Sequence, residues 1–501
     1  MKNKYLKTFA FATAWIIFNP AFGACDNTGN PIQITSSCED LSINNTVTGV
    51  SVASGATVSA FSSTDAVNIG VSGNVTNTFL NSGVISNGIY WNGLVNSGVI
   101  NTLQNQGTIT SGGHNGLTNG GNITTLNNTG TINSDASGST YGALVNSGQI
   151  SALNNSGTIS ATVGTLGNGA YAIQQNGRIG TLNNSGTISA QNNAIYFQPA
   201  FSARIDTLIN SGTIQGGVNG SGSSTFASAI VLGVANSIGT ITNTGTIDHS
   251  VCSGGTCYAA IENNGGSIGT INNLGNLTSG NTGSNGYGII NGTTGTIGTL
   301  NNGQNNLTYR GTLPTNYNII ISSSSNYGKT TFSNVSGSSM TFGIGTGSAI
   351  SRSNTYADVL SGITASNLAN TSGSLGRGVV LTQWSLTNTS GTNWSFTTTP
   401  SAPVAPTVTY SYAGTKLAAA LTTAYTYAAA GGLNPVLSNG VTLGSAVQDL
   451  TTSQVNQLIN VHAEGYSSNM TIGLEQMAHI TNTVMDRIHA PMGASPSTKV
   501  Y

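Results

Sequence analysis

Apolar and polar positions recur along the chain in a ten-residue motif, I-x-x-L-x-N-x-G-x-I, that starts eight times from Ile100 onward. The starts are Ile100, Ile123, Ile150, Ile179, Ile205, Ile238, Ile268 and Ile297. By subtraction, successive starts lie 23 to 33 residues apart, so each unit is one motif plus a loop of variable length. A repeat of this period indicates stacked units rather than a single globular core.

The same residue types hold the same positions in each unit. The second apolar column is Leu103, Leu126, Leu153, Leu182, Leu208, Ile241, Ile271 and Leu300, and the asparagine column is Asn105, Asn128, Asn155, Asn184, Asn210, Asn243, Asn273 and Asn302. Glycine and a final apolar residue follow in seven units, and Gln304 and Asn306 replace them in the eighth. From the leucine onward the spacing is two, which is the period of a strand.

Stacking of identical units explains why the columns are uniform. A strand this short cannot bury its apolar face alone, whereas coils in register place like residues on one another in a continuous core. Asparagine suits the turn because its amide can bond the amides above and below it. We predict an all-β fold, a parallel β-helix (solenoid) rod that rises about 4.8 Å per coil, with a short α-helical C-terminal segment. The main alternative, a β-propeller, normally needs about 40–45 residues per repeat.

Beyond Asn306 the motif gives way to alternating, Ser/Thr/Gly-rich sequence. It ends in two predicted strands around Trp384 and Trp394, with a turn at positions 390–391 between them. Prolines at positions 400, 403 and 406 then mark a linker. Past the linker, an Ala-rich segment over 417–430 and apolar residues spaced three and four apart between 452 and 488 predict helices. The Ala-rich segment is too short to span a membrane.

The N-terminus is typical of a secretory signal peptide. Lys2, Lys4 and Lys7 precede an apolar stretch over 9–18 and a small-residue cleavage site at 21–23. The apolar stretch has about half of the roughly 20 residues that a membrane-spanning helix needs. A lipoprotein site at Cys25 is the alternative, but Phe22 matches such a site poorly. We therefore predict export.

The cysteines form two close pairs, Cys25 with Cys38 and Cys252 with Cys257. An even number of cysteines in an exported chain predicts two short disulfides. A zinc site would need further ligands, and only His249 lies near the second pair. We expect no metal and no cofactor.

Charged residues make up only 5% of the chain, against about 25% in ordinary soluble domains. Stacking accounts for this, because a charge repeated on every coil would face its own copy about 4.8 Å away. Between Ala24 and Gly303 the only lysines or arginines are Arg178 and Arg204. The chain has no basic patch for nucleic acid, so we expect no nucleic-acid partner.

This order of parts resembles the autotransporters, bacterial surface proteins that direct their own secretion. The coils, such as Gly177-Arg178-Ile179 through Leu182-Asn183-Asn184-Ser185-Gly186-Thr187-Ile188, resemble their passenger β-helix. The segment Tyr356-Ala357-Asp358-Val359-Leu360-Ser361-Gly362-Ile363 and the two Trp strands resemble the passenger region that helps folding. The segments at 450–454 and 463–467, running to Ile488, resemble the helix that threads the translocator barrel. The resemblance implies an outer-membrane translocator barrel as a partner.

The resemblance divides the chain into seven parts. They are a signal peptide (1–23), an N-terminal cap (24–75), the repeat β-helix passenger (76–310), an autochaperone-like β region (311–400), a Pro-containing linker with an Ala-rich helix (401–440), an α-helical segment that would precede a barrel (441–490) and a truncated tail (491–501). An eight-stranded barrel needs on the order of 80 residues, and only 14 follow Arg487. We expect either a chain cut short relative to its family or a pore supplied by a separate polypeptide.

Catalytic chemistry is not expected on this rod. Asp135, Asp206 and Asp248 lie in different columns, so they should be isolated, solvated turn residues that do not converge on one site. His114 and His249 fall in loops of distant coils, and the other histidines lie in the helical tail. We therefore predict that the chain is not an enzyme.

Aromatic residues recur in the variable loops about once per coil. They are Tyr90, Trp91, Tyr141, Tyr171, Tyr196, Phe197, Phe201 and Tyr258. One interpretation is that they cap the core or form an internal stack. The other is an exposed stripe that binds glycan or protein, because aromatic side chains supply contact area at a low cost in side-chain entropy.

These expectations define an adhesive rod at the bacterial outer membrane, on the cell surface or in the extracellular space. Its partners would be a host-cell or matrix glycan or protein, or another copy of itself. The alternatives are a secreted, toxin-like passenger that acts on host cells and, less favoured, a carbohydrate-active β-helix enzyme.

Overall fold

The computed structural model describes residues 22–60, 64–88, 91–135, 141–162, 170–199, 201–218, 228–249, 259–280, 286–351, 353–375, 382–400 and 434–435. They belong to two compact units. The first contains the described residues up to Gly345, with Tyr356–Thr371 and Leu386–Phe396, and the second contains Thr346–Thr355, Ser372–Ser385 and the described residues from Thr397 onward.

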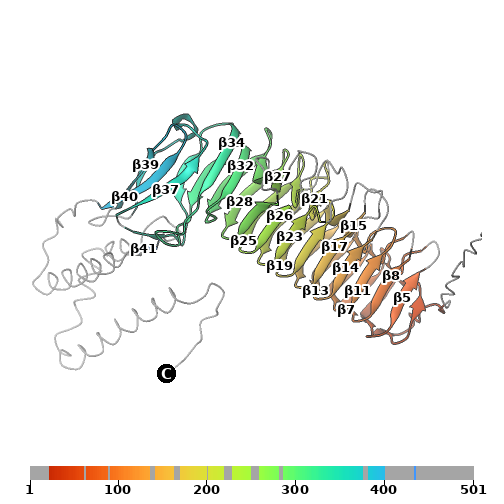
Figure 1. Cartoon of the computed structure of the whole chain (residues 1–501). Helices are drawn as coiled ribbons and strands as arrows, with labels where there is room; N and C mark the ends of the chain where they lie inside the picture. The colour runs from red at the N-terminus through yellow and green to blue at the C-terminus, as the bar shows by residue number, and fades with distance from the viewer. Residues whose placement is uncertain are drawn as a thin grey trace, which may run out of the picture. The chain divides into compact units, whose positions relative to one another are not determined.

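Strands of the first unit form three sheets of parallel strands, and each of the first ten coils adds one strand to each sheet (Figure 1). The first sheet contains β1 (Ile32–Ile34), β4 (Thr46–Val52), β7 (Asn74–Asn81), β10 (Val99–Asn105), β13 (Asn122–Asn128), β16 (Gln149–Asn155), β19 (Arg178–Asn184), β22 (Arg204–Asn210), β25 (Ser237–Asn243), β28 (Ser267–Asn273), β31 (Thr296–Asn302), β33 (Asn316–Ile319) and β35 (Thr341–Ile344). The second contains β2 (Cys38–Glu39), β5 (Thr57–Ala60), β8 (Val84–Asn87), β11 (Thr108–Ser111), β14 (Thr131–Ser134), β17 (Thr158–Ala161), β20 (Thr187–Ala190), β23 (Thr213–Gly216), β26 (Thr246–His249) and β29 (Asn276–Ser279). The third begins with β3 (Leu41–Ile43), β6 (Val67–Ile69), β9 (Leu94–Asn96), β12 (Leu117–Asn119), β15 (Gly142–Asn146), β18 (Tyr171–Gln175), β21 (Ile195–Phe197), β24 (Ile230–Leu232), β27 (Ala259–Asn263), β30 (Tyr287–Asn291), β32 (Leu307–Thr312), β34 (Thr330–Ser336) and β37 (Asn354–Ser361).

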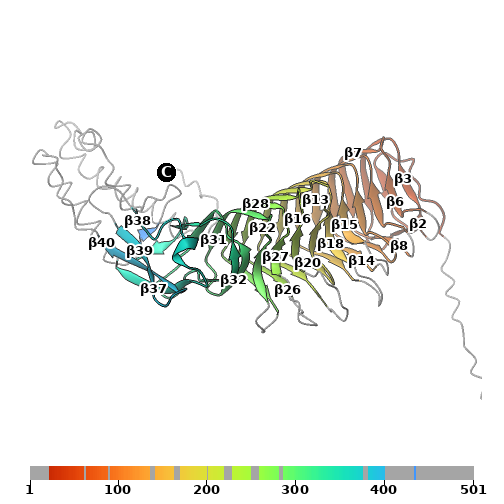
Figure 2. The ribbon, with the colours of Figure 1, turned by 90° about the horizontal axis from the view of Figure 1, so that it is seen from above.

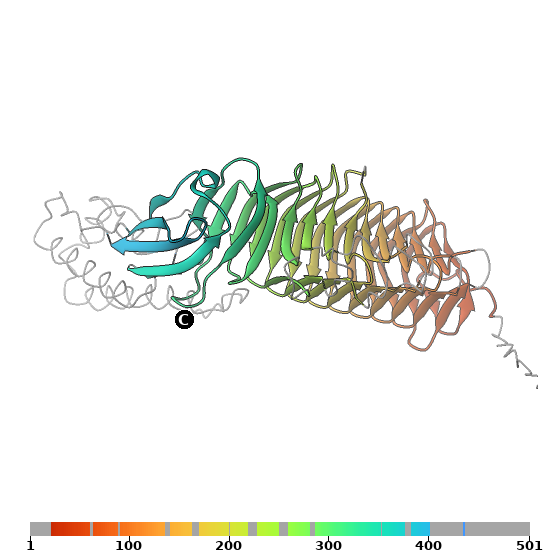
Figure 3. The same cartoon turned by 45° about the horizontal axis from the view of Figure 1, so that its top comes forward.

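This arrangement confirms the predicted parallel β-helix. Successive copies of the motif pair in register, so that Ile100 lies beside Ile123 and Leu103 beside Leu126, and the same pairing continues to β31. Figures 2 and 3 show the coils following one another along the first unit. The coil begins earlier than the motif does, because β1 to β6 already contribute to all three sheets. The predicted helical segment after position 440 lies outside the described residues.

The interior is formed by the uniform columns of the motif. Every isoleucine that starts a motif, and every residue of the second apolar column, is buried. The asparagine column is also buried, and its side chains form a hydrogen-bonded ladder from Asn81 to Asn302 with N···O distances of 2.7 to 3.3 Å. Each amide satisfies its neighbour, which is the condition for burying polar groups without penalty. The predicted asparagine ladder is therefore confirmed.

The glycine column follows from the close approach of consecutive turns. A Cβ atom at Gly130 would lie 2.1 Å from the carbonyl oxygen of Gly107 in the preceding coil. Each following glycine of the column meets its predecessor in the same way. Any side chain at this position would push the coils apart, so only glycine allows the turns to stack.

The C-terminal part of the first unit keeps the stacking but changes the interior. Among the described residues, the second sheet ends at β29 while the first and third continue. Their interior contains buried aromatic residues, namely Tyr309, Tyr317, Phe332, Phe342, Tyr356 and Phe396. The single short 3-10 helix of the described residues, η1, covers Ala365–Asn367.

The strands predicted around the two tryptophans are present as β39 (Thr382–Asn388) and β40 (Trp394–Pro400). Gly391, in the turn between them, has a positive φ of 67°. In the second unit, β38 (Ser372–Leu375) pairs antiparallel with residues 382–385 of β39. The short β36 (Ala349–Ile350) pairs antiparallel with β41 (Asn434–Pro435).

Candidate binding surface

Three rings stack on consecutive coils at the corner that leads into the third sheet. Trp91, His114 and Tyr141 each lie three residues before the first inward-facing apolar residue of β9, β12 and β15. Because these strands pair in register, the three side chains fall in one column. The ring centroids of Trp91 and His114 are 6.3 Å apart, and those of His114 and Tyr141 are 4.2 Å apart. We call these three residues the aromatic ladder.

A second stack continues on the next two coils. The rings of Tyr171 and Tyr196 have centroids 4.4 Å apart and are almost parallel, with an interplanar angle of 10°. The backbone N–H of Tyr171 donates to the carbonyl oxygen of Tyr141, so this pair follows directly after the ladder. Burial raises the pKa of Tyr171 to about 12, and burial also raises the pKa of Tyr196. Both phenols therefore stay neutral at physiological pH.

Stacking determines which parts of the rings a ligand can reach. In a ladder, the face of each inner ring is covered by its neighbour, and mainly the ring edges remain accessible. Trp91 is the N-terminal member of the ladder, and Thr64 holds the corresponding position in the preceding coil. Trp91 is 41% exposed, whereas His114 and Tyr141 are only partly exposed. Trp91 is therefore the ring of the ladder most open to a partner.

A ladder of Asp and Asn side chains lies one residue further along each coil. Asp65 Oδ1 accepts hydrogen bonds from the backbone N–H and Nδ2 of Asn92, both at 2.9 Å. Asn92 Oδ1 accepts in the same way from Asn115, at 3.3 and 3.0 Å, and Asn115 Oδ1 accepts from the backbone N–H of Gly142 at 2.9 Å. These bonds hold in place the residues that directly follow Trp91, His114 and Tyr141, so the backbone of the aromatic ladder is fixed.

His114 is a member of the surface that the sequence did not indicate. His114 lies in a loop, as the sequence predicts, but no residue pattern predicts that its ring stacks between those of Trp91 and Tyr141. Burial lowers the pKa of His114 below 6.5, and the negative charge of Asp65 partly offsets this effect. The signal that could have identified it is its spacing of three residues before Leu117, which Trp91 and Tyr141 share relative to Leu94 and Leu144.

The remaining predicted aromatic residues are placed differently. Phe197 is fully buried in the solenoid interior, because side chains alternate along β21 and Tyr196 takes the outward position. It therefore offers no surface to a ligand, and its place in the predicted stripe of ligand-binding aromatic residues is wrong. Phe201, by contrast, is 53% exposed. Tyr90 and Tyr258 lie outside the described residues.

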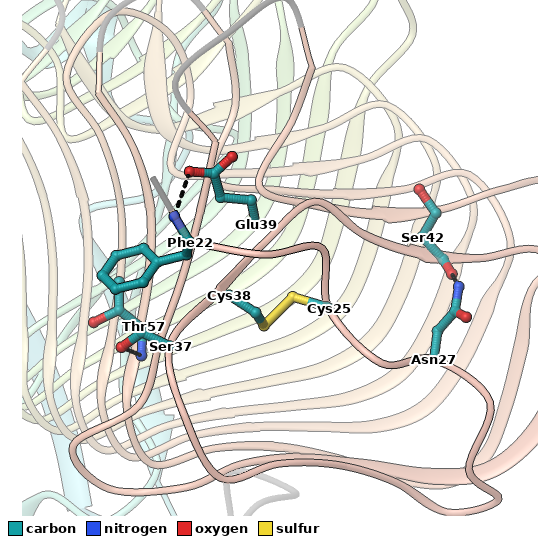
Figure 4. The surroundings of a disulfide bond; sticks show 8 residues. All are labelled: Phe22, Cys25, Asn27, Ser37, Cys38, Glu39, Ser42 and Thr57. Carbon is teal, nitrogen blue, oxygen red and sulfur yellow. Dashed lines mark hydrogen bonds between the residues drawn. A yellow bond between two sulfur atoms is a disulfide. The ribbon is translucent and has the colours of Figure 1, made fainter. Parts of the chain in front are cut away.

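The first predicted disulfide is present, between Cys25 and Cys38 (Figure 4). It joins the N-terminal segment to β2, and further bonds hold that segment in place. The backbone N–H of Phe22 donates to Glu39 Oε1 at 3.1 Å, and Asn27 Nδ2 donates to the carbonyl oxygen of Ser42 at 3.0 Å. Cys252 and Cys257 lie outside the described residues. Within the described ranges, no group of three or more His, Cys, Asp or Glu residues could hold a metal ion.

The acidic residues considered for catalysis lie in different places. Asp248 is in β26 of the second sheet, and Asp135 follows β14. Asp206 is in β22 of the first sheet and forms ion pairs with Arg178 and Arg204. The expectation that Asp206 would be an isolated turn residue is therefore wrong, because Arg178 and Arg204 are neighbours in adjacent coils. Its carboxylate relieves the repulsion between these two guanidinium groups.

His249 also differs from the expectation of a loop residue. It ends β26 and is 1% exposed. Burial lowers its pKa, although the neighbouring Asp248 acts in the opposite direction. A buried, neutral histidine at this position belongs to the packing of the coil.

No family model, no curated protein and no solved structure matches this chain. Among the described residues, no helix has the length and apolar character needed to cross a membrane.

Proposed function

We propose that this chain is an autotransporter-type passenger that acts as an adhesive rod on the bacterial surface. The parallel β-helix is compatible with such a passenger, and the sequence adds an N-terminal segment typical of export. The observation that favours adhesion is the aromatic ladder, which ends in the exposed ring of Trp91 on the surface of a chain with few charged residues. Exposed tryptophans on rigid supports are frequent anchors of binding interfaces.

The proposed partner is a molecule on a host cell or in the extracellular matrix. The ladder meets two requirements of such a contact. Its backbone is fixed by the series of hydrogen bonds that joins Asp65, Asn92, Asn115 and Gly142. Little conformational entropy would therefore be lost on binding. Its outermost ring can transfer apolar area from water to a partner, while the neighbouring carboxylate and amides can form the polar rim of the interface.

Adhesion of the purified full chain to cultured cells and to matrix-coated surfaces tests the proposal. Trp91→Ser is expected to reduce binding at least about tenfold, because an exposed aromatic anchor is lost. The fold should remain, since Trp91 is outside the buried core. Circular dichroism and the thermal unfolding midpoint of the variant would establish this.

Phe201→Ser provides the matched control. It removes an aromatic side chain of similar exposure that lies between β21 and β22, away from the ladder. Adhesion should be unchanged in this variant. Equal losses in both variants, or unchanged adhesion of Trp91→Ser, would contradict a role of the ladder. Permeabilisation of the cells by the purified chain would instead favour a toxin-like passenger.

A further inference from the structure

A groove runs along the turn between the first and second sheets, on a different corner from the aromatic ladder. It has a volume of about 340 Å³ and extends across the coils of β10, β13, β16, β19 and β22. Five coils at a rise of about 4.8 Å give it a length of roughly 19 Å along the stacking direction. The groove is therefore long enough to hold several units of a linear polymer.

The floor of the groove is a second ladder of amides, on the outward side of the first sheet. Asn154 Nδ2 donates to Asn127 Oδ1 at 2.9 Å, and Asn183 Nδ2 donates to Asn154 Oδ1 at 2.8 Å. An asparagine side chain has two N–H donors and two acceptor sites. Each ladder bond uses one donor and one acceptor, so further donors and acceptors remain on Asn127, Asn154 and Asn183.

The wall of the groove consists of hydroxyl groups at the turn. Thr129, Ser156 and Ser185 hold equivalent positions two residues after the floor asparagines. The hydroxyls of Thr129 and Ser185 lie 3.3 and 3.5 Å from backbone carbonyl oxygens of the preceding coil. Their lone pairs remain available as acceptors. At one end Ile209, 40% exposed, interrupts the amide column with an apolar surface.

The charges and the backbone of this region restrict the ligand. None of the residues that line the groove is charged, and Arg178 and Arg204 are already paired with Asp206 on the same face. An anionic polymer therefore gains no ion pair there. The floor is the face of a sheet whose strands are paired on both sides, so an extended peptide cannot add to it as a strand.

We propose that this groove binds an uncharged, linear glycan that lies along the stacked coils. Sugar hydroxyls both donate and accept hydrogen bonds, which matches a lining of amides and hydroxyls. The asparagines repeat the same groups on three successive coils, so successive sugars meet similar partners there. Ile209 can contact an apolar C–H face of a sugar ring. This site is independent of the aromatic ladder and of the adhesion proposed for it.

The test uses the purified full chain and three neutral probes, cellohexaose, chitohexaose and maltohexaose, with a heparin hexasaccharide as an anionic comparison. Binding is followed by saturation-transfer NMR and by isothermal titration calorimetry. At least one neutral probe should bind, and more tightly than the heparin fragment. The double substitution Asn154→Leu and Asn183→Leu should weaken that binding at least tenfold.

The outward-facing column of the first sheet that contains Asn154 and Asn183 also provides a matched control. Asn272, Asn301 and Asn318 form an equivalent amide ladder, with Asn301 Nδ2 to Asn272 Oδ1 at 2.6 Å and Asn318 Nδ2 to Asn301 Oδ1 at 2.8 Å. This ladder does not line the groove, and Leu274 and Gly303 take the places of the hydroxyl residues. Asn301→Leu should leave glycan binding unchanged.

Three results would overturn the proposal. They are the absence of binding of every neutral probe, an equal loss of binding in Asn301→Leu, and tighter binding of the heparin fragment. Sedimentation velocity of the same samples tests the other occupant, a second rod whose coils have the same rise. Self-association that Asn154→Leu and Asn183→Leu abolish, without glycan binding, would assign the groove to a second copy. Adhesion through Trp91 would be unaffected by any of these outcomes.

Discussion

The repeat region from β10 to β31 and the C-terminal part of the first unit use the same parallel stacking but fill it differently. In the repeats, isoleucine, leucine and asparagine each lie on their own kind in the next coil. In the C-terminal part, buried rings meet at angles instead, with Tyr309 and Phe332 tilted by 49° and Tyr317 and Phe332 by 67°. The first interior is a set of columns and the second is a cluster.

This difference shows what each kind of interior can do. A column can be extended by further coils, because each coil contacts only its neighbours and each residue packs on one of the same type. A ring cluster cannot repeat in this way, but it buries more apolar area per residue. Burial raises the pKa of Tyr317 to about 12, and its hydroxyl lies 2.8 Å from Thr330 Oγ1. The hydroxyl of Tyr317 in the cluster therefore has an individual hydrogen-bond partner, whereas the buried amides of the repeats bond one another in a continuous ladder.

The largest effect is expected in the ring cluster. Phe342 is 1% exposed, and its ring centroid lies 6.0 Å from that of Tyr317 and 5.8 Å from that of Phe396. Phe342→Ala should lower the free energy of unfolding by about 4 kcal/mol, because it removes a large buried side chain and leaves a cavity. Denaturant titration followed by circular dichroism measures this. An effect as small as that of the exposed control Phe201→Ala would mean that the cluster is loosely packed.

A smaller effect is expected where coils approach in the repeats. Gly121→Ala would place a Cβ atom 2.1 Å from the carbonyl oxygen of Gly98, so the backbone must move. We expect a loss of about 3 kcal/mol in the same titration. The adjacent Gly120 is the control, because its Cβ would meet only the carbonyl oxygen of Asn96, at 3.8 Å. Equal stability of the two variants would show that turn spacing does not limit the stacking.

Breaking the buried ladder should have a moderate effect. Asn155 accepts from Asn128 at 2.7 Å and donates to Asn184 at 2.8 Å. Asn155→Ala leaves both partners without these bonds in the interior, which should cost about 2 kcal/mol. Asn154→Ala, one residue away on the outward side, should cost less than about 1 kcal/mol, because water can replace its bonds. Similar losses would mean that the buried ladder contributes no more than the surface ladder.

The smallest effect concerns the protonation of His114. Burial lowers its pKa below 6.5, so the folded state favours the neutral ring. The stability that this group contributes is fully present above pH 6.5 and is lost as the pH falls through the lowered pKa. An NMR titration of the His114 ring should give a value below 6.5, and Trp91→Ala should raise it by exposing the ring to water. A value of 6.5 or above in the unmodified chain would contradict the stacked geometry.

Much of the fold could be predicted because the motif repeats. The Ile, Leu, Asn and Gly columns were visible in the sequence, and a residue that stacks on its own copy must keep the same type in every unit. The surface was less predictable. His114 differs in type from Trp91 and Tyr141, so no uniform column revealed it. Phe197 and Tyr196 are adjacent aromatic residues, and only the direction of β21 shows that one faces inward and the other outward.

For the repeats, the sequence by itself determined the coil, its register and the Ile, Leu, Asn and Gly columns. These properties depend on contacts between copies of one motif, and one copy predicts the contacts of the next. Only the tertiary structure decided what the surface presents. The pairing of Arg178 with Asp206, the ring stack from Trp91 to Tyr141 and the amide floor of the groove each join residues more than 20 positions apart. Loops of unequal length separate these residues, and they meet because the interior ladders bring every coil back to the same register.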